Sequence, residues 1–207
     1  MSERISFAFV FTIYFMLLGP LKIIPAFLKL TREADREFKR DVAIKASMTA
    51  TALVAVVVLL GKGLVARYEI SLDSVRIAGG LVLLLAALKV VFPGPEPVRA
   101  EVAKPTALQL AISPVAMPIT VPPAGVAAIL ITLLLAPKYP GMGSVIVWGL
   151  ATMMTLDFLA MYFIDTLAEV PGLLLLLQVL GAVLIFIQIA LAIETFLVAF
   201  RDLALIR

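Results

Sequence analysis

The feature that most constrains this chain is a series of long, nearly uncharged apolar stretches. A hydrocarbon core about 30 Å thick needs roughly 20 apolar residues in helical form, so each stretch is long enough to cross a membrane. Hydrophobic residues make up 63% of the chain and charged residues 15%, whereas a soluble domain has about a quarter of its residues charged. We therefore expect an all-α, polytopic membrane protein with six transmembrane helices. The stretches run over about 5–30, 42–60, 72–92, 106–135, 144–164 and 173–200.

The chain contains neither cysteine nor histidine. Zinc, haem and iron–sulfur sites and the Ser-His and Cys-His nucleophiles all need one of these residues. Asp157 is the one carboxylate near the middle of a stretch. General acid–base chemistry in the membrane would need a cluster of carboxylates or a histidine. We therefore expect no enzyme, no metal site and no cofactor. The net charge of +3 does not indicate a nucleic acid partner, because Lys and Arg accumulate in cytoplasmic loops for topological reasons.

Basic residues also predict the orientation of the chain in the membrane. The loop after the first stretch carries Arg32, Arg36, Lys39 and Arg40, whereas the following loop is less basic. Since basic loops stay in the cytoplasm, the first loop is predicted to be cytoplasmic. Both termini then lie outside.

Two pairs of residues indicate an internal repeat. Pro20 and Pro122 are separated by 102 positions, and so are Gly79 and Gly181. Pro123 is an alternative partner for Pro20, which leaves the register open by one residue. Each copy contains three stretches, an odd number, so the second copy must cross the membrane in the opposite sense.

The predicted architecture is therefore a 3+3 inverted repeat made of residues 1–103 and 104–207. In this architecture substrates bind near the midplane, where discontinuous helices of the two halves meet.

Proline interrupts the first stretch of each half. Proline has no N–H and clashes with the preceding helical turn, so the first and fourth helices are predicted to be broken, the first at Gly19-Pro20 followed by Pro25. Backbone that leaves a helix at membrane depth must face protein or a water-filled cavity. Free N–H groups at the resulting half-helix N-termini suit a carboxylate. The predicted substrate-binding residues are Gly19, Pro20, Leu21, Lys22, Thr120, Val121, Pro122, Pro123, Ala124 and Gly125.

Intramembrane polar residues are costly and often functional. Asp157 is a candidate protonatable or cation-coordinating group, with a structural hydrogen-bonding role as the alternative. Lys22 is a candidate to meet a substrate carboxylate, close a gate or pair with Asp157; a side chain that snorkels to the surface is the alternative. Gln188 is predicted to hydrogen-bond across helices. Further candidates to line the cavity are Ser47, Thr152, Thr155 and Arg76, for which helix packing or headgroup contact is an equal explanation.

Three segments resemble signatures of the MarC family. Residues 19–27 resemble its D-P-x-G-N-x-P-x-F motif, residues 76–80 are similar to its R-I-A-G-G motif, and residues 114–125 are similar to P-L-A-I-P-L-L-A-G-P-G-A. The chain departs from these patterns at Gly19, at Lys22-Ile23 and at 122–124. The resemblance implies a six-span inner-membrane protein of bacteria or archaea, whose SnatA-type members transport neutral amino acids such as glycine and alanine.

Together these features predict a secondary transporter of a small zwitterionic or neutral solute that works by alternating access, with H⁺ or Na⁺ coupling. ATP drive is not expected, since the chain has no G-x-x-x-x-G-K-[ST] motif. The alternative is a passive channel or exporter for small neutral metabolites.

Overall fold

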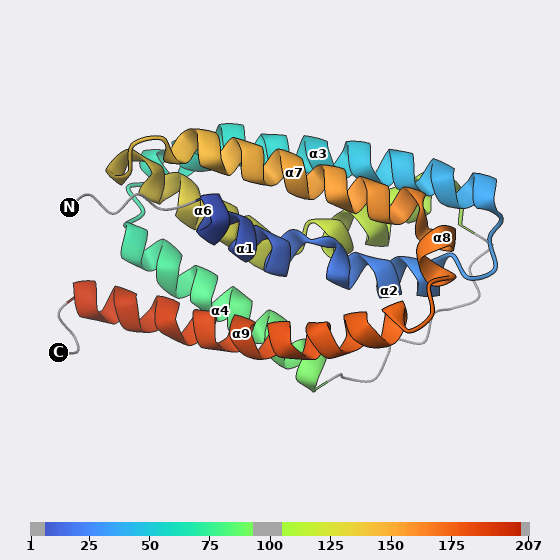
Figure 1. Ribbon diagram of the computed structural model, residues 1–207. Coiled ribbons are helices and arrows are strands. Elements are labelled where there is room, and N and C mark those ends of the chain that lie inside the picture. Colours follow the sequence, from blue (N-terminus) through green and yellow to red (C-terminus); the bar gives the residue numbers. More distant parts are fainter. Residues whose placement is uncertain (1–6, 93–104, 204–207) are drawn as a thin grey trace.

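The computed structural model describes residues 7–92 and 105–203, and every regular element in these ranges is a helix (Figure 1). This confirms the all-α prediction. The elements are α1 (Phe7–Leu18), α2 (Pro20–Leu30), α3 (Arg36–Arg67), α4 (Leu72–Val91), α5 (Ala107–Leu110), η1 (Ala111–Thr120), α6 (Pro123–Leu135), η2 (Ala136–Lys138), α7 (Met142–Tyr162), α8 (Ile164–Ala168) and α9 (Leu173–Asp202).

Five helical segments in the described ranges are long and apolar enough to cross a membrane. They are Phe7–Leu30, Arg36–Arg67, Leu72–Val91, Met142–Tyr162 and Leu173–Asp202. A sixth is formed if Ala107–Thr120 and Pro123–Lys138, which meet at a 56° bend, are counted as one broken span. These segments correspond to the six predicted stretches.

The second span is longer than its apolar stretch, which covers only residues 42–60. Helix α3 begins at Arg36 because the Asp35 side chain accepts a hydrogen bond from the Phe38 N–H at 2.8 Å, which caps one of the first-turn donors. It continues to Arg67. Hydropathy therefore located the part inside the membrane and missed the polar turns at both ends.

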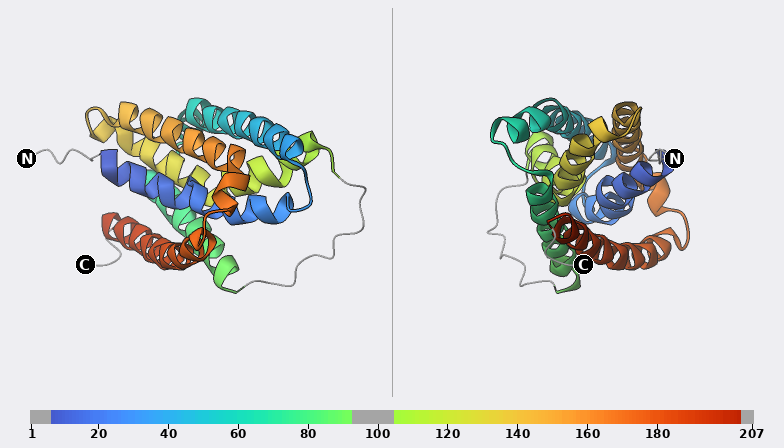
Figure 2. Two further views of the ribbon diagram at one scale, coloured as in Figure 1. Left: turned by 45° about the vertical axis from the view of Figure 1, so that its right-hand side comes forward. Right: turned by 90° about the vertical axis from the view of Figure 1, so that its left-hand side faces the viewer.

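Successive spans alternate in direction along the bundle. Helix α1 begins at the end of the bundle where α9 finishes, and α2 ends at the opposite end beside the start of α3 (Figures 1 and 2). The fourth span, α5–η1–α6, therefore runs opposite to the first. The boundary predicted between residues 103 and 104 and the proline-rich connector around it lie outside the described residues, and the equivalence of the two halves stays a prediction.

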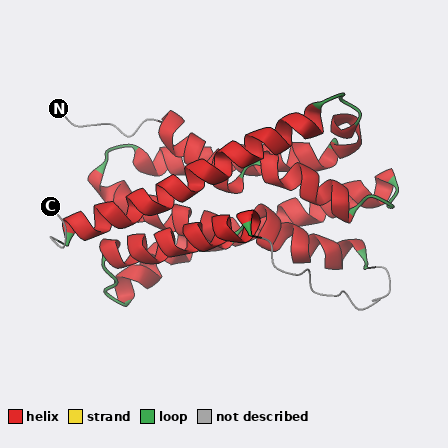
Figure 3. Ribbon diagram, turned by 90° about the horizontal axis from the view of Figure 1, so that it is seen from below, coloured by secondary structure: helices red, strands yellow, loops and turns green. Residues whose placement is uncertain are grey.

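The helices form two groups. Helices α4 and α9 pack along each other on one side of the bundle, and the other spans pack together on the opposite side (Figures 1 and 3). The broken spans α1–α2 and α5–η1–α6 lie in the interior of this second group, with α3 and α7 beside them. This arrangement surrounds both breaks with protein.

The apolar core consists of two clusters, one toward each end of the bundle. In the first span, the buried residues of α1 up to Leu18 belong to the first cluster. The buried residues of α2 from Ile23 onward belong to the second cluster. On α3, Ala46 belongs to the second cluster and Ala50 to the first, so the boundary between the clusters lies between these two residues. We call the zone between the clusters the seam, and it crosses the first span at its break.

Tyr14 ties α1 to α6 within the first cluster. Its ring is fully buried, and its hydroxyl is 2.6 Å from the Thr132 hydroxyl. Side-chain hydrogen bonds between membrane helices contribute about 0.6 kcal/mol on average, so Tyr14→Phe is expected to lower the Tm of the detergent-solubilised protein slightly. The control is Tyr68→Phe at an exposed site. An equal loss of stability in both variants would contradict a role for the Tyr14–Thr132 bond.

Candidate functional site

The first break is a single extended residue between two helices. Helix α1 ends at Leu18, Gly19 has φ −77° and ψ 173°, and α2 begins at Pro20 without a side-chain cap. The Gly19 N–H still donates to the Phe15 carbonyl at 3.0 Å. Pro20 has no N–H, and the N–H groups of Leu21 and Lys22 in the first turn have no acceptor within their own helix. The break therefore creates a half-helix N-terminus in the interior of the bundle.

The second break is more extensive. Ser113 and Met117, each before a proline, have extended dihedral angles inside η1, as proline imposes on the residue that precedes it. The chain stays non-helical at Val121 and Pro122, and α6 begins at Pro123 without a side-chain cap. The predicted break in the fourth span is confirmed.

The N-terminus of α6 repeats the arrangement at α2. The Val126 N–H donates to the Pro122 carbonyl at 3.1 Å, which closes the first helical turn. Ala124 and Gly125 therefore carry first-turn N–H groups with no acceptor within the helix. Each half-helix thus begins with a proline followed by two N–H donors.

The two breaks meet inside the bundle. A Cβ atom built on Gly125 would overlap the side chain of Leu18, the last residue of α1, and would lie 3.5 Å from Cδ of Pro122. A larger residue at 125 would require the Leu18 side chain to move, so glycine favours this close approach of α6 to the end of α1. Leu18 was not predicted as a site residue, because a leucine in an apolar stretch carries no signal in the sequence.

The two candidate partners of Pro20 occupy different positions in the fourth span. Pro20 and Pro123 both occupy the first position of their helices, whereas Pro122 is the preceding cap residue. The glycines of the second predicted pair have different surroundings, since a Cβ atom built on Gly79 would lie 2.8 Å from Cδ1 of Ile131, whereas one built on Gly181 would have nothing within 4 Å. The equivalence of the two halves therefore stays a prediction.

Asp157 lies on the buried face of α7 at the level of the first break. Its side chain is 1% exposed, and neither carboxylate oxygen has a hydrogen-bond partner. Helices α1 and α7 run in the same direction (Figure 1), and a Cβ atom built on Gly149 would lie 3.2 Å from Cδ2 of the Tyr14 ring. On α7 the first core cluster ends at Met154 and the second begins at Ala160, so Asp157 lies between them. Asp157 therefore belongs to the seam.

Lys22 is engaged with a residue other than Asp157. Its Nζ donates to Oε1 of Gln188 at 3.0 Å, and Nε2 of Gln188 donates to the Leu83 carbonyl at 3.0 Å. These bonds link α2, α9 and α4 and confirm that Gln188 hydrogen-bonds across helices. Of the predicted roles for Lys22, pairing with Asp157 is not seen here.

Three predicted residues are not brought to the seam. The Thr152 and Thr155 hydroxyls donate to the carbonyls four residues earlier on their own helix, and Thr155 faces outward. The guanidinium of Arg76 bonds to Asp73 and Asp202, where α4 begins and α9 ends. These three side chains stabilise helices or join their ends. Pro25, predicted to extend the first break, lies inside α2 without ending it.

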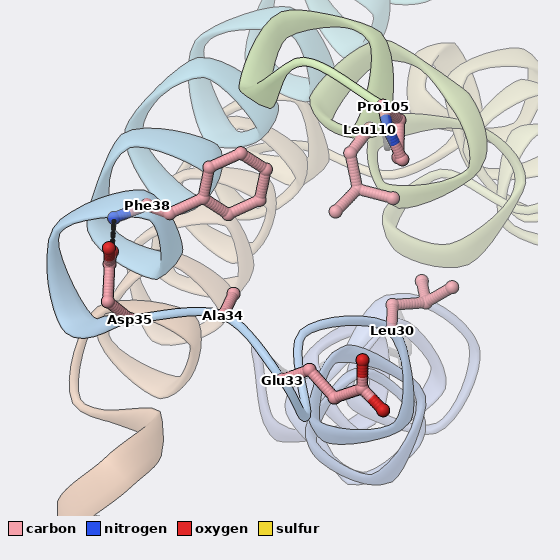
Figure 4. Close-up of a pocket in the computed structure, with 7 residues that line it drawn as sticks. All are labelled: Leu30, Glu33, Ala34, Asp35, Phe38, Pro105 and Leu110. Carbon is pink, nitrogen blue, oxygen red and sulfur yellow. Dashed lines mark hydrogen bonds between the residues drawn. The ribbon is translucent and has the colours of Figure 1, made fainter. Parts of the chain in front are cut away.

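Two hollows lie away from the breaks. One, of about 360 Å³, is at the end of the bundle where α2 leads into α3 (Figure 4), and the other is an apolar groove of about 900 Å³ between α3 and α7. None of the predicted substrate-binding residues lines either of them. The first is lined by Leu30, Glu33, Ala34, Asp35, Phe38, Pro105 and Leu110.

Comparison with known proteins gives relatives in bacteria and archaea. The chain is 25% identical over 191 residues to the UPF0056 inner membrane protein YhgN of Escherichia coli, covering 86% of this chain and 92% of the relative. It is 29% identical over 130 residues to the UPF0056 membrane protein MJ1677 of Methanocaldococcus jannaschii, covering 61% and 63% of the two chains. No solved structure matches it.

The membrane-length helices and the inner-membrane relative agree with the predicted localisation, and the protein is a multi-pass inner membrane protein. Residues 5–200 match the family described as MarC family integral membrane protein. The match includes both breaks and all of the membrane-length segments except the last two residues of α9. This chain therefore belongs to the MarC family.

Proposed function

We propose that this protein is a secondary transporter of small neutral amino acids of the glycine and alanine type, working by alternating access with ion or proton coupling. The observation that carries the proposal is the meeting of the two breaks in the interior of the bundle, where Gly125 in the first turn of α6 packs against Leu18, which ends α1 just before the uncapped N-terminus of α2. A discontinuous helix pair near the midplane is the usual place for a substrate site in transporters. We propose transport as the role of this chain, and no catalytic one.

The chemistry of this site suits a carboxylate. The first-turn N–H groups of Leu21, Lys22, Ala124 and Gly125 are hydrogen-bond donors without acceptors in their own helices. Each helix N-terminus also carries about half a positive charge. A substrate carboxylate would satisfy the donors and the helix dipoles together.

The same geometry favours a small substrate. Gly125 already contacts Leu18 so closely that a Cβ would overlap it, and Leu18 and Ala124 are buried. Recognition by backbone N–H groups also does not depend on the side chains that differ from the family pattern at Gly19 and Lys22. Glycine and alanine therefore remain suitable substrates despite these departures.

The seam also suits alternating access. The first core cluster separates the breaks from one end of the bundle and the second cluster separates them from the other end. A site between two apolar clusters opens to one side when one cluster loosens and the other stays packed. We propose that the two halves rock against each other about the seam to achieve this.

Uptake by proteoliposomes tests the proposal. Radiolabelled glycine is expected to accumulate above its external concentration when a sodium or pH gradient is imposed, and protein-free liposomes are the control. Excess alanine should compete, whereas glycinamide should not, because it lacks the carboxylate. Uptake that stops at equal concentrations would show a passive channel instead. Equal competition by glycinamide would contradict carboxylate recognition at the helix N-termini.

A further inference from the structure

The apolar groove between α3 and α7 lies on the outer surface of the bundle. It has a volume of about 900 Å³ and is lined by residues between Ser47 and Leu59 on α3 and between Val147 and Phe158 on α7. At its far end Leu59 is 77% exposed and Val147 is 57% exposed. The lining side chains are apolar apart from three hydroxyls, and none is charged. Both helices are of membrane length, so this groove faces lipid.

Small side chains keep this groove open. Ala52 and Ala55 of α3 and Ala151 of α7 line it, and all three are exposed. A larger side chain at Ala55 or Ala151 would occupy part of the groove without displacing a buried residue. These two positions therefore allow the groove to be filled by substitution while the core stays unchanged.

Two aromatic rings connect one end of the groove to a cation. The guanidinium carbon of Arg40, on α3, lies 4.9 Å from the centre of the Tyr162 ring, on α7. The centre of the Tyr162 ring lies 5.4 Å from that of Phe158, which lines the groove. Arg40 is exposed. The groove therefore ends next to an exposed positive charge that bridges the same two helices.

The charge of Arg40 is not neutralised by a carboxylate. Other basic residues near the start of α3 are held in ion pairs, Arg36 and Lys39 with Asp165 and Lys45 with Asp41. Within the ranges that the structure describes, no carboxylate lies within ion-pair distance of Arg40. Its contact with the Tyr162 ring occupies one face of the guanidinium and leaves the N–H groups at the edge free to donate.

We propose that this groove binds an anionic phospholipid, with an acyl chain lying between α3 and α7 and the phosphate at Arg40. A guanidinium presents a rigid fork of N–H donors that matches the oxygens of a phosphate. The uncharged, apolar lining suits a hydrocarbon chain. One lipid molecule thus fits both the groove and the free cation at its end. This inference does not depend on the proposed transport function.

The lengths agree with this arrangement. Helix α3 is continuous from Arg36 to Arg67, so positions along it can be compared on one axis. Arg40 and Ser47 are seven residues apart, or about 10 Å. One leaflet contributes about half of a hydrocarbon core that is roughly 30 Å thick. An acyl chain whose phosphate lies beside Arg40 at the membrane surface therefore reaches the part of the groove that begins at Ser47.

A second copy of the chain is the alternative occupant of an apolar surface in a membrane. Over residues 40–59 of α3 the one acidic residue is Asp41, which is held in an ion pair. Over residues 147–162 of α7 it is Asp157, which is buried. In a symmetric dimer the same patch lies on both subunits, so neither copy offers this face a free carboxylate for Arg40. A lipid phosphate supplies the missing negative charge.

Native mass spectrometry of the purified, delipidated protein in detergent tests the site, with palmitoyl-oleoyl phosphatidylglycerol and the matching phosphatidylcholine as probes. Wild type is expected to bind phosphatidylglycerol about fivefold more tightly, the effect of one basic residue at an anionic membrane surface. Arg40→Gln should remove this preference, and Ala151→Phe should weaken the binding of both lipids by filling the groove. The matched controls are Arg67→Gln, at the other end of α3, and Ala182→Phe, on an exposed part of α9. Both should bind as wild type does.

Equal binding of the two lipids by wild type, or a preference that survives Arg40→Gln, would overturn the proposal. Displacement of phosphatidylglycerol by an equal concentration of inorganic phosphate would also overturn it, because the acyl chain would then contribute nothing. A dimer that dissociates in Arg40→Gln and Ala151→Phe without any lipid preference would assign the groove to a second copy. If Ala151→Phe does not elute as wild type does in size-exclusion chromatography, Ala55→Phe on the opposite wall decides the result.

Discussion

Gly19→Ala is expected to lower the free energy of unfolding by about 1–3 kcal/mol, the usual cost of overpacking, and to abolish glycine uptake. A Cβ atom at residue 19 would overlap the carbonyl oxygen of Phe15, which is backbone and cannot move aside as a flexible side chain can. Relief requires a shift that breaks the hydrogen bond from the Gly19 N–H to that carbonyl. The N-terminus of α2 would then leave its place opposite α6.

The measurement is thermal unfolding in detergent together with proteoliposome uptake at equal protein content. Gly181→Ala is the matched control, because it lies within a helix and nothing lies within 4 Å of its added Cβ. This control should be neutral or stabilised by up to about 1 kcal/mol through helix propensity. Wild-type uptake by Gly19→Ala would show that the geometry of the break does not matter for transport.

Gln188→Leu is expected to destabilise the protein by about 1.5–3 kcal/mol, the contribution of a hydrogen bond to a charged group. The substitution leaves the Lys22 ammonium without its partner inside the bundle. It also removes the link from α9 to the Leu83 carbonyl of α4. The double variant Lys22→Met/Gln188→Leu should recover part of the loss, because the stranded charge is then gone.

Gln178→Leu is the matched control for this cycle, since it lies on the same helix with its side chain exposed. Removing an amide there should not destabilise the protein. Thermal unfolding of wild type, Lys22→Met, Gln188→Leu and the double variant in one detergent gives the coupling energy between Lys22 and Gln188. A double variant whose loss equals the sum of the two single losses would show that Lys22 and Gln188 act independently.

The positions of the spans and of both breaks could be predicted from the sequence because their causes are local. Apolar length decides where a helix can cross a membrane, and the missing N–H and the ring of Pro20 and Pro123 disfavour a continuous helix through those positions. Pro25 shows the limit of this reasoning. It lies inside α2 without ending it.

The role of each polar side chain could not be read in the same way. Thr155 and Asp157 are two residues apart, and the structure turns Thr155 outward and buries Asp157. Arg76 bonds to Asp202, 126 positions later, and no local pattern contains that contact. The sequence therefore could not distinguish the polar residues that face the interior from those that face outward, because this depends on how each helix is rotated in the bundle.

The sequence by itself determined an all-helical membrane protein with two broken spans, because membrane thickness and proline geometry act over a few turns of one helix. Only the tertiary structure decided that the two breaks meet, and that Asp157 is buried between the two core clusters. These facts depend on the register between helices, which is set by contacts such as Gly125 with Leu18 and Gly149 with Tyr14. Such contacts join residues more than a hundred positions apart, beyond the reach of any local pattern.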